Sequence, residues 1–200
     1  MTTWPSIGGS LTNETVDKVP SEISYSQNPP TWGRMFRAGE ERVGWFKLHL
    51  DPEAGKTIYR DEYLDQAIDP GNPDALLKLP LGKTALEVCT DYLRQVYTHM
   101  MAMLERRLPD TIDTMPIKFV ITTPAMWSTS AQHATMTAAK RAGFGSRPQD
   151  SIATVAEPEA AAAYSLQRLN SLHGHESVSK SVDGNKKFTV SVHMPLLAFD

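Results

Sequence analysis

One carboxylate, Glu157, stands where a predicted strand meets a predicted helix, directly before Pro158. In open parallel sheets, ligands bind beyond the carboxyl ends of the strands. A carboxylate at that place can hold the hydration shell of Mg²⁺ or orient an attacking water, as phosphoryl-transfer sites require. It can equally complement the positive end of the helix dipole without doing any chemistry. Position alone leaves both interpretations open.

Other residues capable of chemistry have simpler structural explanations. The Gly-Lys-Thr triplet at 82–84 resembles the end of a P-loop, but Leu77 stands where that motif needs its first glycine. His173 and His175 have no carboxylate or cysteine at ligand spacing, which argues against a zinc site. Cys89 is the one cysteine of the chain, so an intramolecular disulfide is excluded.

Two strand–helix units are expected to position Glu157. Residues 117–122 are nearly all apolar or β-branched, which predicts a strand buried on both faces of a parallel sheet. Residues 128–142 are alanine-rich and predict a helix that begins at a serine cap and ends at Gly143. Residues 151–156 predict a second strand, and Pro158 begins a second helix. This alternation implies parallel strands joined by right-handed crossovers.

The N-terminal half is expected to contain two helices and an extended run. Residues 19–25 alternate as a strand does, and the spacing of apolar residues over 39–50 predicts a helix that Asp51 and Pro52 end. Proline-rich residues 51–80 are expected to form a long loop. A capping box at Thr84 begins the clearest predicted helix, which extends to Arg107.

The C-terminal part is expected to alternate between surface loop and strand. Residues 170–187 are polar and predict a surface loop, whereas 188–192 and 196–200 are strand-like.

Composition limits the kinds of partner. The net charge is −3 and the sequence pI about 6.1, so no basic surface for nucleic acid or for a membrane is indicated. No apolar run approaches the length of a membrane span, and the first residues do not resemble a signal peptide. A cytoplasmic location is therefore expected.

Two motifs resemble a known family. Residues 119–128, Phe-Val-Ile-Thr-Thr-Pro-Ala-Met-Trp-Ser, and residues 156–164, Ala-Glu-Pro-Glu-Ala-Ala-Ala-Ala-Tyr, are similar to two turns of the seventy-kilodalton heat-shock ATPase domain. Trp127, Ser128 and Glu159 resemble its divergent twelve-type branch, which is abundant in fungi. The resemblance covers nearly all of residues 1–200. It implies an α/β fold: an incomplete actin-like (ribonuclease H-like) ATPase lobe with a mixed sheet and flanking helices.

The resemblance also implies ATP and Mg²⁺ as cofactors and assigns roles to four residues. Glu157 would position the metal-bound waters and the attacking water. Lys47, in Trp-Phe-Lys-Leu, would reach toward the γ-phosphate. Pro124 would lie at the switch turn that relays nucleotide state, and Asp200 would end the strand before the second phosphate loop. Direct protein ligands to the metal are not implied.

ATP binding by this chain is expected to be weak or absent. In the family the first phosphate loop would precede Trp4 and the second would come after Asp200, and their backbone amides supply most of the grip on phosphate. The leading hypothesis is therefore a truncated chaperone ATPase domain, whose parent controls the binding of clients or co-chaperones. The alternatives are a nucleotide-independent protein-interaction module and a sugar- or acetate-kinase-like member of the same superfamily.

Overall fold

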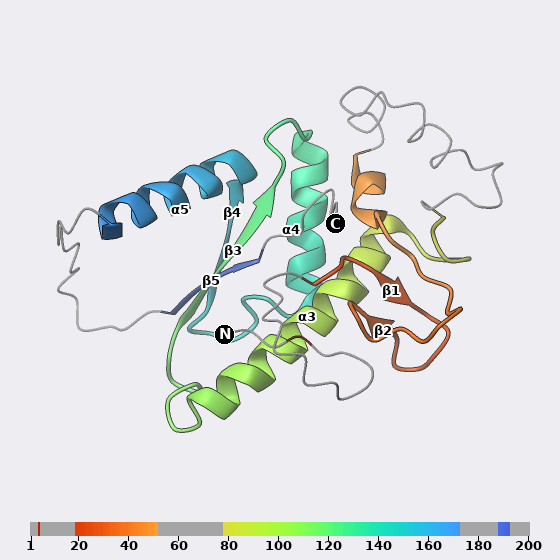
Figure 1. The fold of residues 1–200 in the computed structure, drawn as a ribbon, viewed down its shortest axis with the longest axis horizontal. Helices are drawn as coiled ribbons and strands as arrows, with labels where there is room; N and C mark the ends of the chain where they lie inside the picture. The colour runs from red at the N-terminus through yellow and green to blue at the C-terminus, as the bar shows by residue number, and fades with distance from the viewer. Residues whose placement is uncertain (1–3, 5–18, 52–77, 173–187, 193–200) are drawn as a thin grey trace.

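The protein folds into helices and short strands (Figure 1). The structure is a computed structural model, and it describes residues 4, 19–51, 78–172 and 188–192. The elements, in chain order, are β1 (Ile23–Ser24), β2 (Thr31–Trp32), the 3₁₀ helix η1 (Phe46–Leu50), α3 (Ala85–Arg107), β3 (Ile117–Thr123), α4 (Thr129–Ala142), β4 (Ser151–Ala156), α5 (Glu157–Leu172) and β5 (Phe188–Val192). The α/β class expected from the sequence is thus observed.

Three strands form a parallel sheet in the order β4-β3-β5. Phe119 of β3 is opposite Ile152 of β4 and Val190 of β5, and all three strands run in the same direction. The antiparallel strands β1 and β2 form a separate ribbon. The sheet in the described part of the chain is therefore parallel, whereas the resemblance implied a mixed one.

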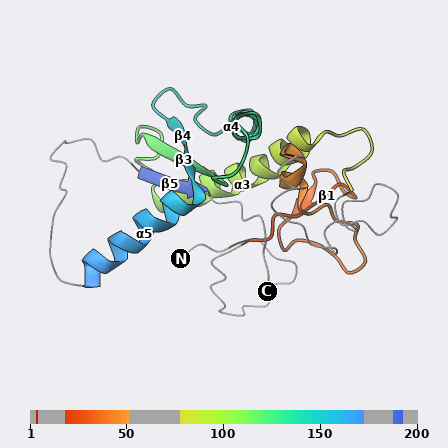
Figure 2. The same ribbon diagram turned by 90° about the horizontal axis from the view of Figure 1, so that it is seen from above.

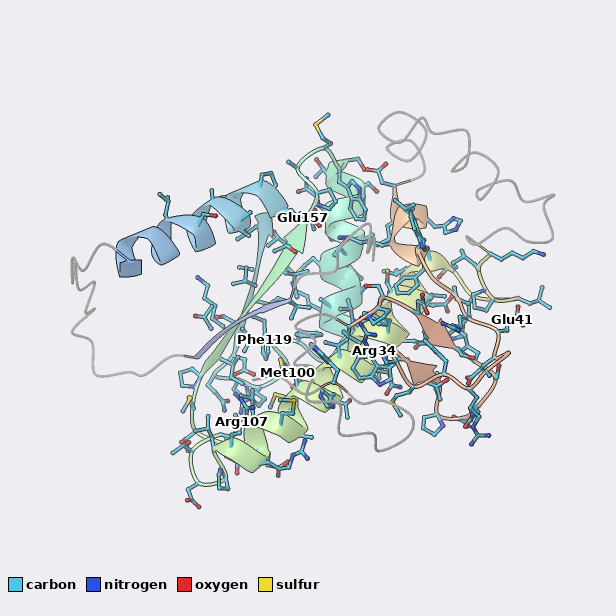
Figure 3. The ribbon with its side chains drawn as sticks, viewed as in Figure 1. Arg34, Glu41, Met100, Arg107, Phe119 and Glu157 are labelled. Carbon is cyan, nitrogen blue, oxygen red and sulfur yellow. The ribbon has the colours of Figure 1, made fainter. Side chains whose placement is uncertain are left out.

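Helices α3 and α4 pack together and cover one face of the sheet. The caps expected from sequence are present: Thr84 and Glu87 form the capping box of α3, and Ser128 accepts a hydrogen bond from the Ala131 amide of α4. Gly143 ends α4 with φ 116°, a conformation that a residue with a side chain rarely adopts. Phe119 lies in the core between the sheet and these helices (Figure 3).

Arg147 connects the segments that lead into β3 and β4 through hydrogen bonds. The Arg147 guanidinium donates to the carbonyls of Ile112 and Met115 and to the Asp150 carboxylate at distances of 2.6 to 2.9 Å. Asp150 Oδ1 in turn accepts from the Ile117 amide at 2.9 Å. One buried carboxylate thus fixes where β3 begins relative to the segment that leads into β4.

The prediction of a helix over residues 39–50 is wrong for most of that segment. The observed helix is the single 3₁₀ segment Phe46–Leu50, and Val43 instead pairs with Ile23 in an antiparallel bridge. Trp45 adopts a left-handed conformation with φ 56°, which no α-helix can continue through. Backbone pairing with the β1–β2 ribbon therefore prevails over the helical spacing of the apolar residues. The strand expected over 19–25 is likewise reduced to the two residues of β1.

Two further expectations need correction. Lys118 is exposed, so β3 is not buried on both faces, because the face opposite α3 and α4 carries less cover. Residues 170–172 belong to α5 rather than to a surface loop, since the helix continues to Leu172. The remaining residues of that predicted loop, 173–187, and the predicted strand 196–200 lie outside the described residues. So does most of the predicted loop over residues 51–80.

Helix α5 projects away from α4 and the body of the molecule (Figure 2). Its first turn continues directly from β4, and its described side chains beyond that turn are exposed, among them Leu166 at 61%. Within the described residues, no helix is long and apolar enough to cross a membrane.

Candidate functional site

The site lies at the carboxyl ends of β3 and β4, where Glu157 begins α5 (Figure 3). Lys47 of η1 reaches this edge, and its Nζ donates to Glu157 Oε1 at 3.1 Å. The strand β4 carries Glu157 to this edge, while η1 is held beside α3 by Phe46, whose ring lies 5.5 Å from that of Tyr92. Two residues that the family resemblance assigns to one site are therefore in contact.

The Lys47 ammonium is buried. Its side chain is 4% exposed, whereas that of Glu157 is 24% exposed. Burial lowers the pKa of Lys47, and the Glu157 carboxylate partly offsets that change. Beside it, burial raises the pKa of the Cys89 thiol to about 12, which makes this thiol an inert neighbour at neutral pH.

An aromatic ring makes a second contact with the ammonium. Lys47 Nζ lies 5.1 Å from the centre of the Trp127 ring, within the range of a cation–π interaction. Trp127 is 4% exposed and packs against Ala131 of α4 and Leu50 of η1. The ring therefore fills the space between η1 and α4 as well as facing the charge.

A buried carboxylate connects the same two segments. Asp51, 6% exposed, comes directly after η1, and its Oδ2 accepts from the Ser128 amide at 2.7 Å. Ser128 is the N-cap of α4, so the charge lies at the positive end of that helix. Asp51 and Trp127 together hold η1 against the turn between β3 and α4.

Pro124 lies within that turn, directly after β3. Its carbonyl accepts from the Trp127 amide at 3.2 Å, which closes the turn. The structure thus brings Pro124 into the segment that contacts Lys47. Asp200 lies outside the described residues.

The donor set fits a metal held through water better than one held by protein ligands. Among the described residues, no group of three or more His, Cys, Asp or Glu side chains is placed to hold a metal ion. The ammonium of Lys47 next to Glu157 would also repel a bare divalent cation at that carboxylate. A Mg²⁺ ion with its water shell, carried by a phosphate group, is compatible with one carboxylate and one lysine.

The sequence alone does not reveal two residues of this site. The local pattern predicts only that Asp51 ends a helix. Trp127 is noted only because it resembles one branch of a family. Their contacts join distant segments, which are 77 positions apart in the case of Asp51 and Ser128. No local pattern signals such a pair.

Comparison of the chain with protein-family models, with curated proteins and with solved structures finds no match.

Proposed function

We propose that this chain is part of a heat-shock-type ATPase lobe in which Lys47 and Glu157 face the terminal phosphate of ATP. The observation that supports it best is the ion pair of Lys47 and Glu157 at the carboxyl edge of a parallel sheet. Its support from sequence is the resemblance of the turns around Pro124 and Glu157 to those of that family.

The chemistry of the pair suits phosphoryl transfer. A buried ammonium stabilises negative charge on phosphate oxygens more strongly than an exposed one, because water does not screen it. A carboxylate nearby can accept a hydrogen bond from a water and orient it. Magnesium, carried with the nucleotide, would supply further charge neutralisation, and Glu157 would hold its water shell.

Affinity for nucleotide is proposed to be low. In the described residues, no glycine-rich loop offers the run of backbone amides that grips a triphosphate. Lys47 and Glu157 alone would bind Mg-ATP with a dissociation constant on the order of 1 mM. The role of such a lobe is to pass the state of the nucleotide to client or co-chaperone proteins.

Titration of the full chain with Mg-ATP, monitored by NMR, tests the proposal. The signals of Lys47 and Glu157 should shift at millimolar nucleotide, and Lys47→Met should abolish the response. Lys118→Met is the matched control, because Lys118 is an exposed lysine on β3. A response that persists unchanged in Lys47→Met would overturn the site. Micromolar affinity would overturn the low-affinity proposal.

A nucleotide-independent interaction module is the second candidate, and the exposure of α5 favours it. The described side chains from Ala161 to Leu166 are exposed, and Leu166 is a large apolar residue. A module of this kind would retain its partners equally with and without Mg-ATP. Loss of a defined partner in Leu166→Glu, but not in Lys47→Met, would favour this function over the first.

A further inference from the structure

Two described residues, Glu157 and Trp127, attract the Lys47 ammonium from different elements. Glu157 attracts it from the start of α5, at 3.1 Å. The Trp127 ring attracts it from the turn before α4, at 5.1 Å from the ring centre. A lysine side chain has four flexible carbons, and a single ion pair allows its head group to pivot. Two attractions from different elements restrict that pivot.

The surroundings make the ring contact strong. Trp127 is 4% exposed and the Lys47 side chain is 4% exposed, so little water competes for the ammonium. Cation–π attraction is weak at exposed sites and grows when both partners lose water. Glu157 from α5 and Cys89 from α3 are among the titratable groups that act on the ammonium.

Trp127 is held by contacts to its side chain and by hydrogen bonds to its backbone. Leu50 and Ala131 pack on it, the Trp127 amide donates to the Pro124 carbonyl, and Gln132 Nε2 donates to the Trp127 carbonyl at 3.0 Å. The amide of the next residue, Ser128, donates to Asp51. The position of Trp127 is therefore coupled to the turn before α4 and to the end of η1.

We propose that Trp127 is a positioning residue that holds the Lys47 ammonium against Glu157 at the end of the sheet. Its ring lies 5.1 Å from the ammonium, and the hydrogen bonds of its backbone set where that ring stands. The consequence for phosphate binding rests on the proposed function. The positioning itself does not.

The test observes Lys47 by NMR in the full chain with lysine labelled with carbon-13 and no nucleotide present. The Lys47 signal is assigned by its loss in Lys47→Arg. In the wild type, the ε protons should be shifted upfield by the ring. In Trp127→Leu, that shift should disappear and the pKa of Lys47 should fall by about half a unit to one and a half units. Trp127→Phe, which keeps a smaller aromatic face, should retain part of the upfield shift of the ε protons and show a smaller fall in the pKa of Lys47.

An internal control comes from a second lysine–aromatic pair. Lys83 Nζ lies 4.8 Å from the centre of the Tyr25 ring. The Lys83 signal should stay unchanged in Trp127→Leu, whereas Tyr25→Leu should change Lys83 and leave Lys47 unchanged. If Trp127→Leu does not fold, as judged by the dispersion of amide signals, Trp127→Phe decides the question. Unchanged Lys47 shifts and pKa in the folded variant overturn the proposal.

The result is independent of nucleotide binding. If Lys47 shows the ring-dependent shift but no response to Mg-ATP, the proposed function fails and the positioning by Trp127 stands. If Lys47 responds to Mg-ATP but its chemical shift and pKa are the same in the wild type and in Trp127→Leu, the positioning by Trp127 fails and the proposed function stands.

Discussion

Lys47 Nζ and Glu157 Oε1 lie 3.1 Å apart although 110 positions of sequence separate the two residues. The contact joins the short helix η1 to the first residue of α5, across the end of the parallel sheet. Its two partners differ in burial, at 4% and 24% exposed. Because of that difference, the loss of one partner should affect stability more than the loss of the other.

Removing the carboxylate should cost more stability than removing the ammonium. Glu157→Gln takes a charged partner away from a buried cation and should lower the free energy of unfolding by about 1–3 kcal/mol at neutral pH. Lys47→Met leaves a carboxylate that water can still reach, and should cost less. Urea unfolding of both single variants and the double variant measures the coupling. Strict additivity of the two effects would contradict a direct interaction.

Cys89 should make the fold sensitive to alkaline pH. Its pKa is about 12 in the fold, compared with about 8.5 in an unfolded chain. The unfolded chain therefore loses this proton first, so the contribution is fully present below pH ~8.5 and declines as pH rises toward 12. By pH 10 the loss should reach about 2 kcal/mol. Denaturant unfolding at pH 7 and pH 10 should show this decline in the wild type and a smaller one in Cys89→Ala.

Asp51→Ala should loosen the junction of η1 and α4. The variant leaves the Ser128 amide without its charged acceptor in a buried place, which should cost about 1–3 kcal/mol of unfolding free energy. Asp51→Asn keeps an acceptor oxygen and should cost less. Near-ultraviolet circular dichroism should also change in Asp51→Ala, because the Trp127 ring lies at this junction. A spectrum and stability equal to those of the wild type would contradict the assignment.

Arg147→Ala should be among the most destabilising surface changes. It removes the guanidinium donor from the Ile112 and Met115 carbonyls and from the buried Asp150 carboxylate, which keeps only the Ile117 amide among the donors described above, and should cost about 2–4 kcal/mol. Arg147→Lys should recover little, because one ammonium cannot reach three acceptors in a fixed fork. Arg42→Ala is the matched control. Its ion pair with Glu22 is exposed and should cost less than about 1 kcal/mol in thermal unfolding.

The sequence predicted the elements from Thr84 onward well because their signals are local. The capping box at Thr84, the serine cap at Ser128 and the left-handed Gly143 each act within one turn of chain. Two apolar runs joined by a helix also leave few topologies besides parallel pairing. The position of Glu157 could be predicted from these elements.

Residues 19–51 were predicted poorly because their structure depends on distant partners. Val43 has helical spacing with Phe46 and Leu50, yet it pairs with Ile23 across the ribbon. Asp51 and Trp127 become part of the site through contacts with segments far along the chain. Nothing near these residues in sequence indicates those contacts.

Parallel strands have no hairpin to align them, so the Arg147–Asp150 bridge has an effect at the opposite end of the sheet. Six residues of β4 separate this bridge from Glu157, a span of about 20 Å. A one-residue slip there would move the carboxylate by about 3.3 Å and turn its side chain to the other face. Insertions or deletions between Gly143 and Asp150 should therefore be tolerated less well than their distance from Lys47 suggests. The length of that remote connection therefore controls whether Glu157 is in register to contact Lys47.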